Sequence, residues 1–148
     1  MPPDSQCDLV QLSTHTRPMP DTTAVDTVRE FWRLMASNDF HCVAAVLSPD
    51  FVLEWPQSKE RIRGAERFAR MNHEYPAQGR WQFTINRLVG GSSEAVSDVT
   101  VTDGALVARA ISFFTVANGK VVRLVEFWPD PFDAPAWRAD LVERKRTT

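Results

Sequence analysis

Two acidic residues in the C-terminal half lie in apolar, strand-like stretches, where carboxyl groups are uncommon. Glu126 lies in RLVEFWPDP, two residues before Trp128, and Asp98 lies in EAVSDVTVT. Alternate residues of a strand share one face, so Glu126 is expected on the same face as Leu124 and Trp128. Burial beside tryptophan disfavours the charged form of a carboxyl group and raises its pKa. Glu126 is therefore a candidate general acid or base.

Other arrangements that support catalysis are missing from the sequence. The three histidines, His15, His41 and His73, are scattered and do not have the spacing of metal ligands. The chain has neither a glycine-rich phosphate loop nor a GxSxG motif. We therefore predict no metal and no cofactor. Any chemistry must rely on carboxylates, hydroxyl groups and bound water.

The hairpin turns decide whether the two acids share a face. The Asp-Gly dipeptide at 103–104 and the Asn-Gly dipeptide at 118–119 are strong hairpin signals. If both turns have two residues, Asp98, Arg109 and Glu126 lie on one face. If both have three residues, Arg109 moves to the other face, because a register shift of one residue moves every side chain of a strand to the opposite face of the sheet. Asp98 and Glu126 stay together in both cases, and only a mixed pair of turns separates them.

The space between these acids is the predicted pocket. Asp98 and Glu126 lie on strands that flank a common neighbour, so their backbones are about 10 Å apart. Ala108 and Ala110 on that neighbour leave room, and Ser112 joins them if the turns have three residues. The catalytic hypothesis requires both carboxylates to face inward. The alternative is a partly solvated face on which the carboxylates pair with arginines.

Hydrophobic periodicity predicts the order of the elements. Apolar residues at helical spacing predict helices at 21–39, 39–48 and 61–75. Alternating residues and turn signals predict strands at 50–55, 80–89, 94–102, 105–116 and 120–128. A short C-terminal helix capped by Asp133 follows, with Trp137 and Leu141 one turn apart. Residues 1–21 are polar and proline-rich and are expected to form a flexible arm, and 22–148 a single domain.

This order predicts an α+β fold, in which helices pack on one face of a curved, mainly antiparallel sheet. The last two strands are apolar on both faces, so we expect the outer face to be covered by a second copy in a homodimer. A net charge of -2 and a pI of about 5.9 argue against nucleic acid as a partner. No apolar run approaches the roughly 18 residues of a membrane span. The N-terminus does not resemble a secretory signal, so we expect a cytoplasmic protein.

Two segments resemble the SnoaL-like branch of the nuclear transport factor 2-like superfamily. They are DFVLEWPQSKERIRGAERFARMN and NGKVVRLVEFWPDPFDAPAW, and the resemblance extends over about residues 22–142. It implies a cone-shaped α+β barrel in which one curved sheet wraps around three N-terminal helices. This fold supports many chemistries, including those of ketosteroid isomerases, epoxide hydrolases, scytalone dehydratase and polyketide cyclases.

The resemblance also suggests which residues take part in chemistry. At the positions of the isomerase base, tyrosine donor and aspartic acid donor stand Trp55, Phe31 and Ser112, which argues against that mechanism. Asp98 and Glu126 match the two carboxylates of the epoxide hydrolases. The residues that hold water in those enzymes are replaced by Leu53 and Trp55. In the polyketide cyclases, an acid on the last strand corresponds to Glu126.

The resemblance favours three-residue turns and implies a largely apolar cavity with four polar groups. The expected lining is Phe31, Met35, Leu47, Leu53, Trp55, Met71, Asn72, Asp98, Ser112, Leu124, Glu126 and Trp128. Such a cavity suits a cyclic or aromatic apolar molecule.

Two functions remain open at this stage. The first is a cofactor-independent enzyme for cyclisation, isomerisation, dehydration or hydration. In it, Glu126 is the general acid or base, and Asp98 holds a water or sets the pKa of Glu126. Asn72 and Ser112 then stabilise developing negative charge on oxygen. The second is a ligand-binding or dimerisation module without catalysis, in which the carboxylates are structural.

Overall fold

The structure, a computed structural model, describes residues 23–145, and the predicted arm at 1–21 lies outside this range. In chain order the elements are α2 (Ala24–Ala36), the 3-10 helix η1 (Phe40–Val46), β1 (Leu47–Trp55), β2 (Glu60–Arg63), α3 (Ala65–Glu74), β3 (Gln82–Gly90), β4 (Glu94–Thr102), β5 (Val107–Ala117), β6 (Lys120–Phe127) and the 3-10 helix η2 (Ala136–Leu141).

Helix α2 begins at a capping box. The Thr23 hydroxyl accepts a hydrogen bond from the Asp26 backbone N–H at 3.2 Å, and the Asp26 carboxylate accepts one from the Thr23 N–H at 3.3 Å. These bonds satisfy N–H groups that a helix start leaves without a partner. Phe31, Trp32 and Met35 lie on the buried face of the helix. The cap fixes where α2 starts, and the apolar stripe fixes which face meets the sheet.

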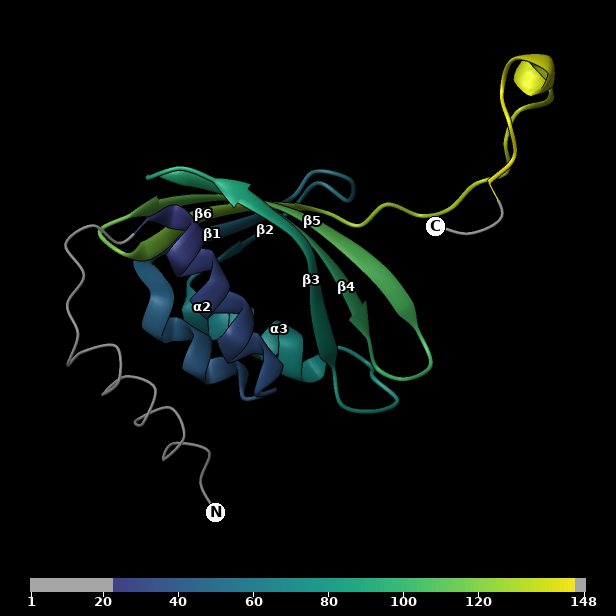
Figure 1. The fold of residues 1–148 in the computed structure, drawn as a ribbon. Helices are drawn as coiled ribbons and strands as arrows, with labels where there is room; N and C mark the ends of the chain where they lie inside the picture. The colour runs from purple at the N-terminus through teal and green to yellow at the C-terminus, as the bar shows by residue number, and fades with distance from the viewer. Residues whose placement is uncertain (1–22, 146–148) are drawn as a thin grey trace.

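Six strands form one open sheet in the order β2-β1-β6-β5-β4-β3. The pairs are antiparallel except β1 and β6, which are parallel. Helices α2 and α3 lie on the concave side of the sheet, and no helix within residues 23–145 lies on its convex side (Figure 1). The predicted α+β class, with one curved and mainly antiparallel sheet, is confirmed.

Aromatic side chains join the helices to the sheet. Phe31 on α2 contacts Phe114 on β5 edge to face, with ring centroids 5.1 Å apart, and contacts Phe68 on α3 at 6.0 Å. Phe68 in turn contacts Phe51 on β1 at 5.6 Å. Edge-to-face pairs of this kind contribute roughly 0.5–1.5 kcal/mol each beyond the area they bury. The core therefore holds the helices against the concave face.

Strand β2 was not predicted. The sequence pattern placed residues 61–63 in a helix, but in the structure Arg61 pairs with Glu54 and Arg63 with Val52 on β1. Gly64 then turns the chain with a φ of 91°, a conformation that a residue with a side chain rarely adopts. Helix α3 consequently begins at Ala65.

The hairpin between β4 and β5 has a loop of four residues, 103–106, because Thr102 pairs with Val107. The Asp103 carboxylate accepts hydrogen bonds from the backbone N–H groups of Ala105 (3.0 Å) and Leu106 (2.8 Å). It also accepts one from Gln78 N–H at 2.9 Å. This loop is longer than either of the two lengths expected from the sequence.

The hairpin between β5 and β6 has the two-residue Asn118-Gly119 turn, with both residues at positive φ. A bulge follows, because Val116 pairs with Val121 whereas Thr115 pairs with Arg123. The extra residue reverses the faces of β6 beyond it. Glu126 therefore points to the same face as Ser112, as it would after a three-residue turn. The four-residue loop before β5 gives β4 the same alternation as a two-residue turn, so Asp98 points to the opposite face from Ser112. The two hairpins are the mixed pair that separates the acids.

After β6 the chain leaves the sheet and extends away from the rest of the molecule (Figure 1). The short helix η2 follows Pro135 and has no side-chain cap, so the predicted Asp133 cap is wrong. Phe132, Trp137 and Leu141 are 81%, 76% and 78% exposed. This segment therefore presents apolar side chains that its own domain does not cover.

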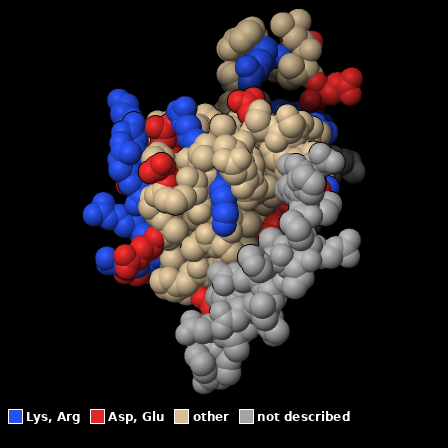
Figure 2. All heavy atoms as spheres, turned by 90° about the vertical axis from the view of Figure 1, so that its left-hand side faces the viewer, with Lys and Arg blue, Asp and Glu red and all other residues tan. Residues whose placement is uncertain are grey.

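Acidic and basic side chains are interspersed along one edge of the surface in Figure 2, and much of the remaining surface in that view is uncharged. No helix within residues 23–145 is long and apolar enough to cross a membrane.

Candidate ligand-binding site

Glu126 lies near the end of β6 and is 6% exposed. Its Oε1 atom accepts a hydrogen bond from Trp55 Nε1 on β1 at 3.1 Å, and its Oε2 atom accepts one from Ser112 Oγ on β5 at 2.8 Å. Because β6 lies between β1 and β5, both neighbouring strands hold this carboxyl group. The donors are neutral, and no cationic side chain in the described chain bonds to Glu126.

Burial raises the pKa of Glu126 above its ordinary value of 4.5, because desolvation disfavours the carboxylate. Hydrogen bonds from Trp55, Ser112 and Trp128 partly oppose this effect, because they stabilise the charged form. The carboxyl group is thus held in place by donors that accommodate either protonation state. It can accept or release a proton closer to neutral pH than an exposed glutamate.

The expectation that Asp98 shares this face is wrong. Ser97, not Asp98, pairs with Ser112 on β5, and Ser112 pairs with Glu126 on β6. Asp98 therefore points to the outer face, where Arg109 Nε donates to Oδ1 at 3.0 Å and Arg109 Nη2 donates to Oδ2 at 2.5 Å. These bonds lower the pKa of Asp98. The structure excludes the predicted pair of pocket carboxylates.

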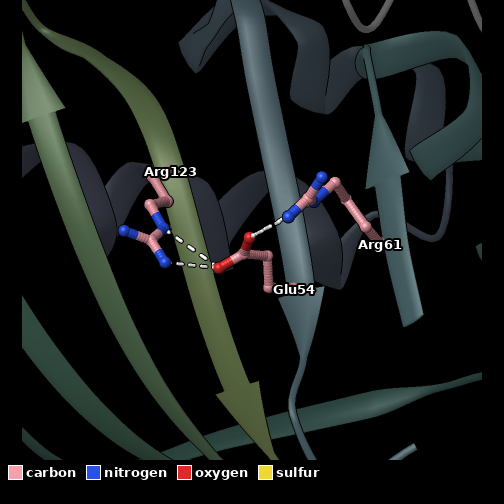
Figure 3. A network of polar contacts seen from close by, with 3 residues as sticks. All are labelled: Glu54, Arg61 and Arg123. Carbon is pink, nitrogen blue, oxygen red and sulfur yellow. Dashed lines mark hydrogen bonds and ion pairs between the residues drawn. The ribbon is translucent and has the colours of Figure 1, made fainter. Parts of the chain in front are cut away.

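A second carboxylate on the outer face is held in the same way. Glu54 on β1 accepts hydrogen bonds from Arg61 on β2 and from Arg123 on β6 (Figure 3). The hydrogen bond from Arg123 makes the largest contribution to lowering the pKa of Glu54. The outer arginines therefore neutralise outer carboxylates and are directed away from Glu126.

A cavity of about 400 Å³ lies between the concave face and helices α2 and α3. It lies within the range of roughly 300–1,000 Å³ found for small-molecule sites. Its lining residues are Phe31, Trp32, Met35, Trp55, Gln57, Ser58, Glu60, Phe68, Met71, Asn72, Tyr75, Trp81, Phe83, Val101, Leu106, Ala108, Glu126, Trp128 and Asp130. The walls are mainly aromatic and apolar, and Glu126 is a buried carboxyl group among them.

Seven residues expected at the pocket line this cavity: Phe31, Met35, Trp55, Met71, Asn72, Glu126 and Trp128. Leu47, Leu53 and Leu124 are instead buried in the core. Ser112 is fully buried and contacts the site through Glu126. Asn72 donates its side-chain N–H to Phe68 O at 2.8 Å, in its own helix. Both residues were expected from the sequence to donate to a ligand, but the Ser112 hydroxyl donates to Glu126 and one Asn72 N–H donates to its own helix.

Several cavity residues were not expected from the sequence. Trp81 and Phe83 lie in the strand expected at 80–89, but nothing in the local pattern linked them to the cavity. Glu60 precedes the helix expected at 61–75, and Asp130 follows the strand expected at 120–128. Ala108 was expected to leave room, and it does line the cavity.

Within the described part of the chain, no group of three or more His, Cys, Asp or Glu side chains is arranged to hold a metal ion.

Comparison with known proteins gives a consistent relationship. Residues 28–124 match the family model of the SnoaL-like domain. A Kribbella flavida DSM 17836 protein, provisionally named a ketosteroid isomerase, is 34% identical, with a TM-score of 0.74 over 82% of this chain and 88% of its own. A Burkholderia xenovorans LB400 NTF-2 like protein of unknown function is 26% identical, with a TM-score of 0.66 over 81% and 93%.

An LEH-like epoxide hydrolase from M. tuberculosis is 23% identical, with a TM-score of 0.59 over 72% of this chain and 82% of its own, which shows a shared fold. No curated protein sequence matches the chain at a significant level.

Proposed function

The chain belongs to the SnoaL-like domain family, and from this premise we propose that it binds a small, largely apolar cyclic or aromatic molecule in the cavity beside Glu126. The observation that carries the proposal is the combination of an aromatic-walled cavity of about 400 Å³ with a buried carboxyl group. Apolar walls with few polar groups are typical of small-molecule sites.

The aromatic side chains supply most of the binding free energy in this proposal. Trp55, Trp81 and Trp128 present large rigid surfaces, and burying an apolar surface stabilises a complex by roughly 25 cal/mol per Å². Glu126 can orient a bound ligand, because its hydrogen bonds with Trp55 and Ser112 fix the position of its carboxyl group. A ligand that places a polar group next to this carboxyl group is therefore favoured over one that does not.

A plug in the cavity tests the proposal. We expect Ala108→Trp to weaken every probe that binds the wild type by at least tenfold, because the new side chain occupies the cavity. The control is Val107→Trp, since Val107 is the preceding residue on β5 and is 71% exposed. The probes are 2-naphthol, tert-butylbenzene and phenyltrimethylammonium, measured by isothermal titration calorimetry, with circular dichroism to verify folding. Equal affinity in both variants, or no binding of any probe to the wild type, would refute the proposal.

A second candidate function is acid–base catalysis by Glu126 alone. It is favoured by the raised pKa of this buried carboxyl group and by its place in the cavity wall. With Asp98 on the outer face, such a reaction requires one proton donor or acceptor and no second carboxylate. Trp55 donates to Glu126, which supports a role in orientation. If a turned-over substrate is found, Glu126→Gln should abolish turnover, and full activity in that variant would refute this candidate.

We further propose that two copies associate through the outer face of the sheet. Phe113 on β5 is 46% exposed there and contacts Phe127 on β6 edge to face at 6.0 Å. Exposed apolar side chains that lie together are typical of interfaces. Sedimentation velocity should give a dimer for the wild type and a monomer for Phe113→Asp. Arg67→Asp, on the exposed side of α3, is the control and should stay dimeric. A monomeric wild type would contradict this.

A further inference from the structure

The cavity carries acidic groups but no basic ones. Glu126 lies in its wall, and Glu60 and Asp130 line it at exposed positions, which gives three carboxyl groups. Among the described residues that line the cavity there is no lysine, arginine or histidine. An anionic ligand would therefore meet like charges and find no cation in these walls.

Four arginines of the sheet and its connections bond elsewhere, and Lys59, between Ser58 and Glu60, is not among the residues that line the cavity. Arg61 and Arg123 bond to Glu54 on the outer face, and Arg109 bonds to Asp98 on that same face. Arg80 donates to the backbone oxygens of Ala36 and Ser37. The outer face of the sheet thus takes three arginines, whereas the charged residues that line the cavity within the described chain are all carboxylic acids.

The aromatic walls also favour positive charge. The ring faces of Trp55, Trp81 and Trp128 carry negative electrostatic potential, and Tyr75 packs edge to face on Trp81 with centroids 5.7 Å apart. A cation within about 6 Å of such a ring is attracted to its face, most strongly in dry sites. Aromatic cages beside a carboxylate suit organic ammonium ions.

Glu126 lacks a positive partner within the described protein. A buried carboxylate is costly unless it is paired with a cation, and its donors here are the neutral Trp55 and Ser112. An ammonium group that enters the cavity would supply the missing countercharge. A protonated amine would donate a charge-assisted hydrogen bond to Glu126, whereas a quaternary ammonium ion has no N–H and would be attracted by its charge alone.

We propose that the cavity selects a hydrophobic ammonium ion over neutral or anionic molecules of the same shape, with Glu126 as the countercharge and the tryptophans as the cage. This inference rests on the proposed function, because it specifies the ligand of that cavity. The ligand class is an organic amine or quaternary ammonium attached to an apolar ring or chain.

A pair of probes that differ in charge but have closely similar shape tests the inference. Phenyltrimethylammonium and tert-butylbenzene have the same skeleton, except that the central atom is N⁺ or carbon, and benzenesulfonate serves as the anion. With the full-length protein at pH 8, we expect calorimetry to give at least tenfold tighter binding of the cation than of the neutral probe. Benzenesulfonate should not bind measurably. Raising the salt concentration should weaken the binding of the cationic probe and leave that of the neutral probe unchanged.

The pH dependence and one variant identify the group responsible. Preference for the cation should fall as pH is lowered and Glu126 becomes protonated; Glu60, Asp130 and Tyr75 are the other titratable groups of the lining. Glu126→Gln should reduce the preference to less than threefold while tert-butylbenzene affinity stays within twofold. Asp98→Asn, on the outer face, should leave the preference unchanged.

The outcomes separate this inference from the proposed function. Equal affinity for the cation and the neutral probe would overturn the inference and leave the binding cavity in place. A preference that survives in Glu126→Gln would overturn the role of Glu126. If neither phenyltrimethylammonium nor tert-butylbenzene binds the wild type, the inference fails, and if 2-naphthol does not bind either, the proposed function fails as well.

Discussion

The two faces of the sheet hold their carboxylates in opposite ways. On the outer face, Asp98 and Glu54 bond to arginines (Figure 3 shows Glu54), and their pKa values lie below the ordinary ones. On the inner face, Glu126 is buried, bonds only to neutral donors in the described chain, and has a raised pKa. The same chemical group therefore belongs to a structural network on one face and to a cavity on the other.

The difference shows that one residue of register decides the role of an acid on this sheet. Ser97 and Asp98 are neighbours on β4, but only Ser97 faces inward, because a four-residue loop and a bulge set the alignment. An aspartate at position 97 would point toward the interior, whereas Asp98 meets Arg109. Composition alone cannot tell which of these two positions faces inward, because Ser97 and Asp98 are adjacent in the same strand.

The largest effect should come from two neighbouring phenylalanines on β5. Phe114 is 1% exposed and faces the core, whereas Phe113 is 46% exposed on the outer face. We expect Phe114→Ala to lower the free energy of unfolding by about 3–5 kcal/mol, the usual cost of removing a buried aromatic ring. Phe113→Ala should cost much less at concentrations where the protein is monomeric. Urea unfolding measures both, and similar losses would contradict the assignment of faces.

A smaller effect is expected at the two buried serines. Ser112→Ala removes a donor to Glu126, so the free energy of unfolding should fall by about 1.5–3 kcal/mol at pH 8. The loss should shrink at pH 4, where Glu126 is protonated, because a hydrogen bond to a neutral group is worth less.

The matched control is Ser97→Ala. Ser97 accepts a hydrogen bond from Trp32 Nε1 at 3.1 Å and has no bond to Glu126. The decrease in the free energy of unfolding caused by Ser97→Ala should be the same at pH 4 and pH 8. Urea unfolding at both pH values compares the two variants. A pH-independent loss in Ser112→Ala would mean that Glu126 does not change its charge in this range.

The smallest effects should be opposite pH slopes in two isosteric variants. The pKa of Glu126 is raised in the folded state, so its stabilising contribution is present below pH 4.5 and disappears as pH rises through the folded value. Wild type should therefore lose stability relative to Glu126→Gln as the pH rises from 4.5 through the folded-state pKa.

For Asp98 the sign is reversed. Its pKa is lowered by Arg109, so its contribution is present above the ordinary value of 3.8 and is lost as pH falls through the folded one. Wild type should lose its advantage over Asp98→Asn below about pH 4. Thermal unfolding from pH 3 to pH 8 measures both slopes. Slopes of the same sign would refute the contrast between the faces.

The sequence predicted the fold class well, because the relevant signals are local. The apolar stripe of α2, the alternation along β3 and the Asn-Gly turn each depend on residues close together in the chain. Glu126 beside Trp128 also follows from alternation within one strand. These features predicted the helices, most of the sheet and the central carboxyl group of the cavity.

The position of Asp98 could not be predicted, because tertiary contacts set it. The Asp103 carboxylate holds its four-residue loop partly through the Gln78 N–H, from a segment 25 residues away. The bulge in β6 leaves Val122 without a pairing partner between Val121 and Arg123. Strand β2 was missed for a similar reason, since its pairing with β1 overrides the helical pattern.

The most direct test is a carbon NMR titration of the side-chain carboxyl groups of Glu126, Asp98 and Glu54. Spectra of Glu126→Gln, Asp98→Asn and Glu54→Gln assign the three signals. We predict a midpoint above 4.5 for Glu126 and midpoints below the ordinary values for Asp98 and Glu54. A Glu126 midpoint at or below 4.5, or a raised midpoint for either outer acid, would contradict the division of roles between the two faces.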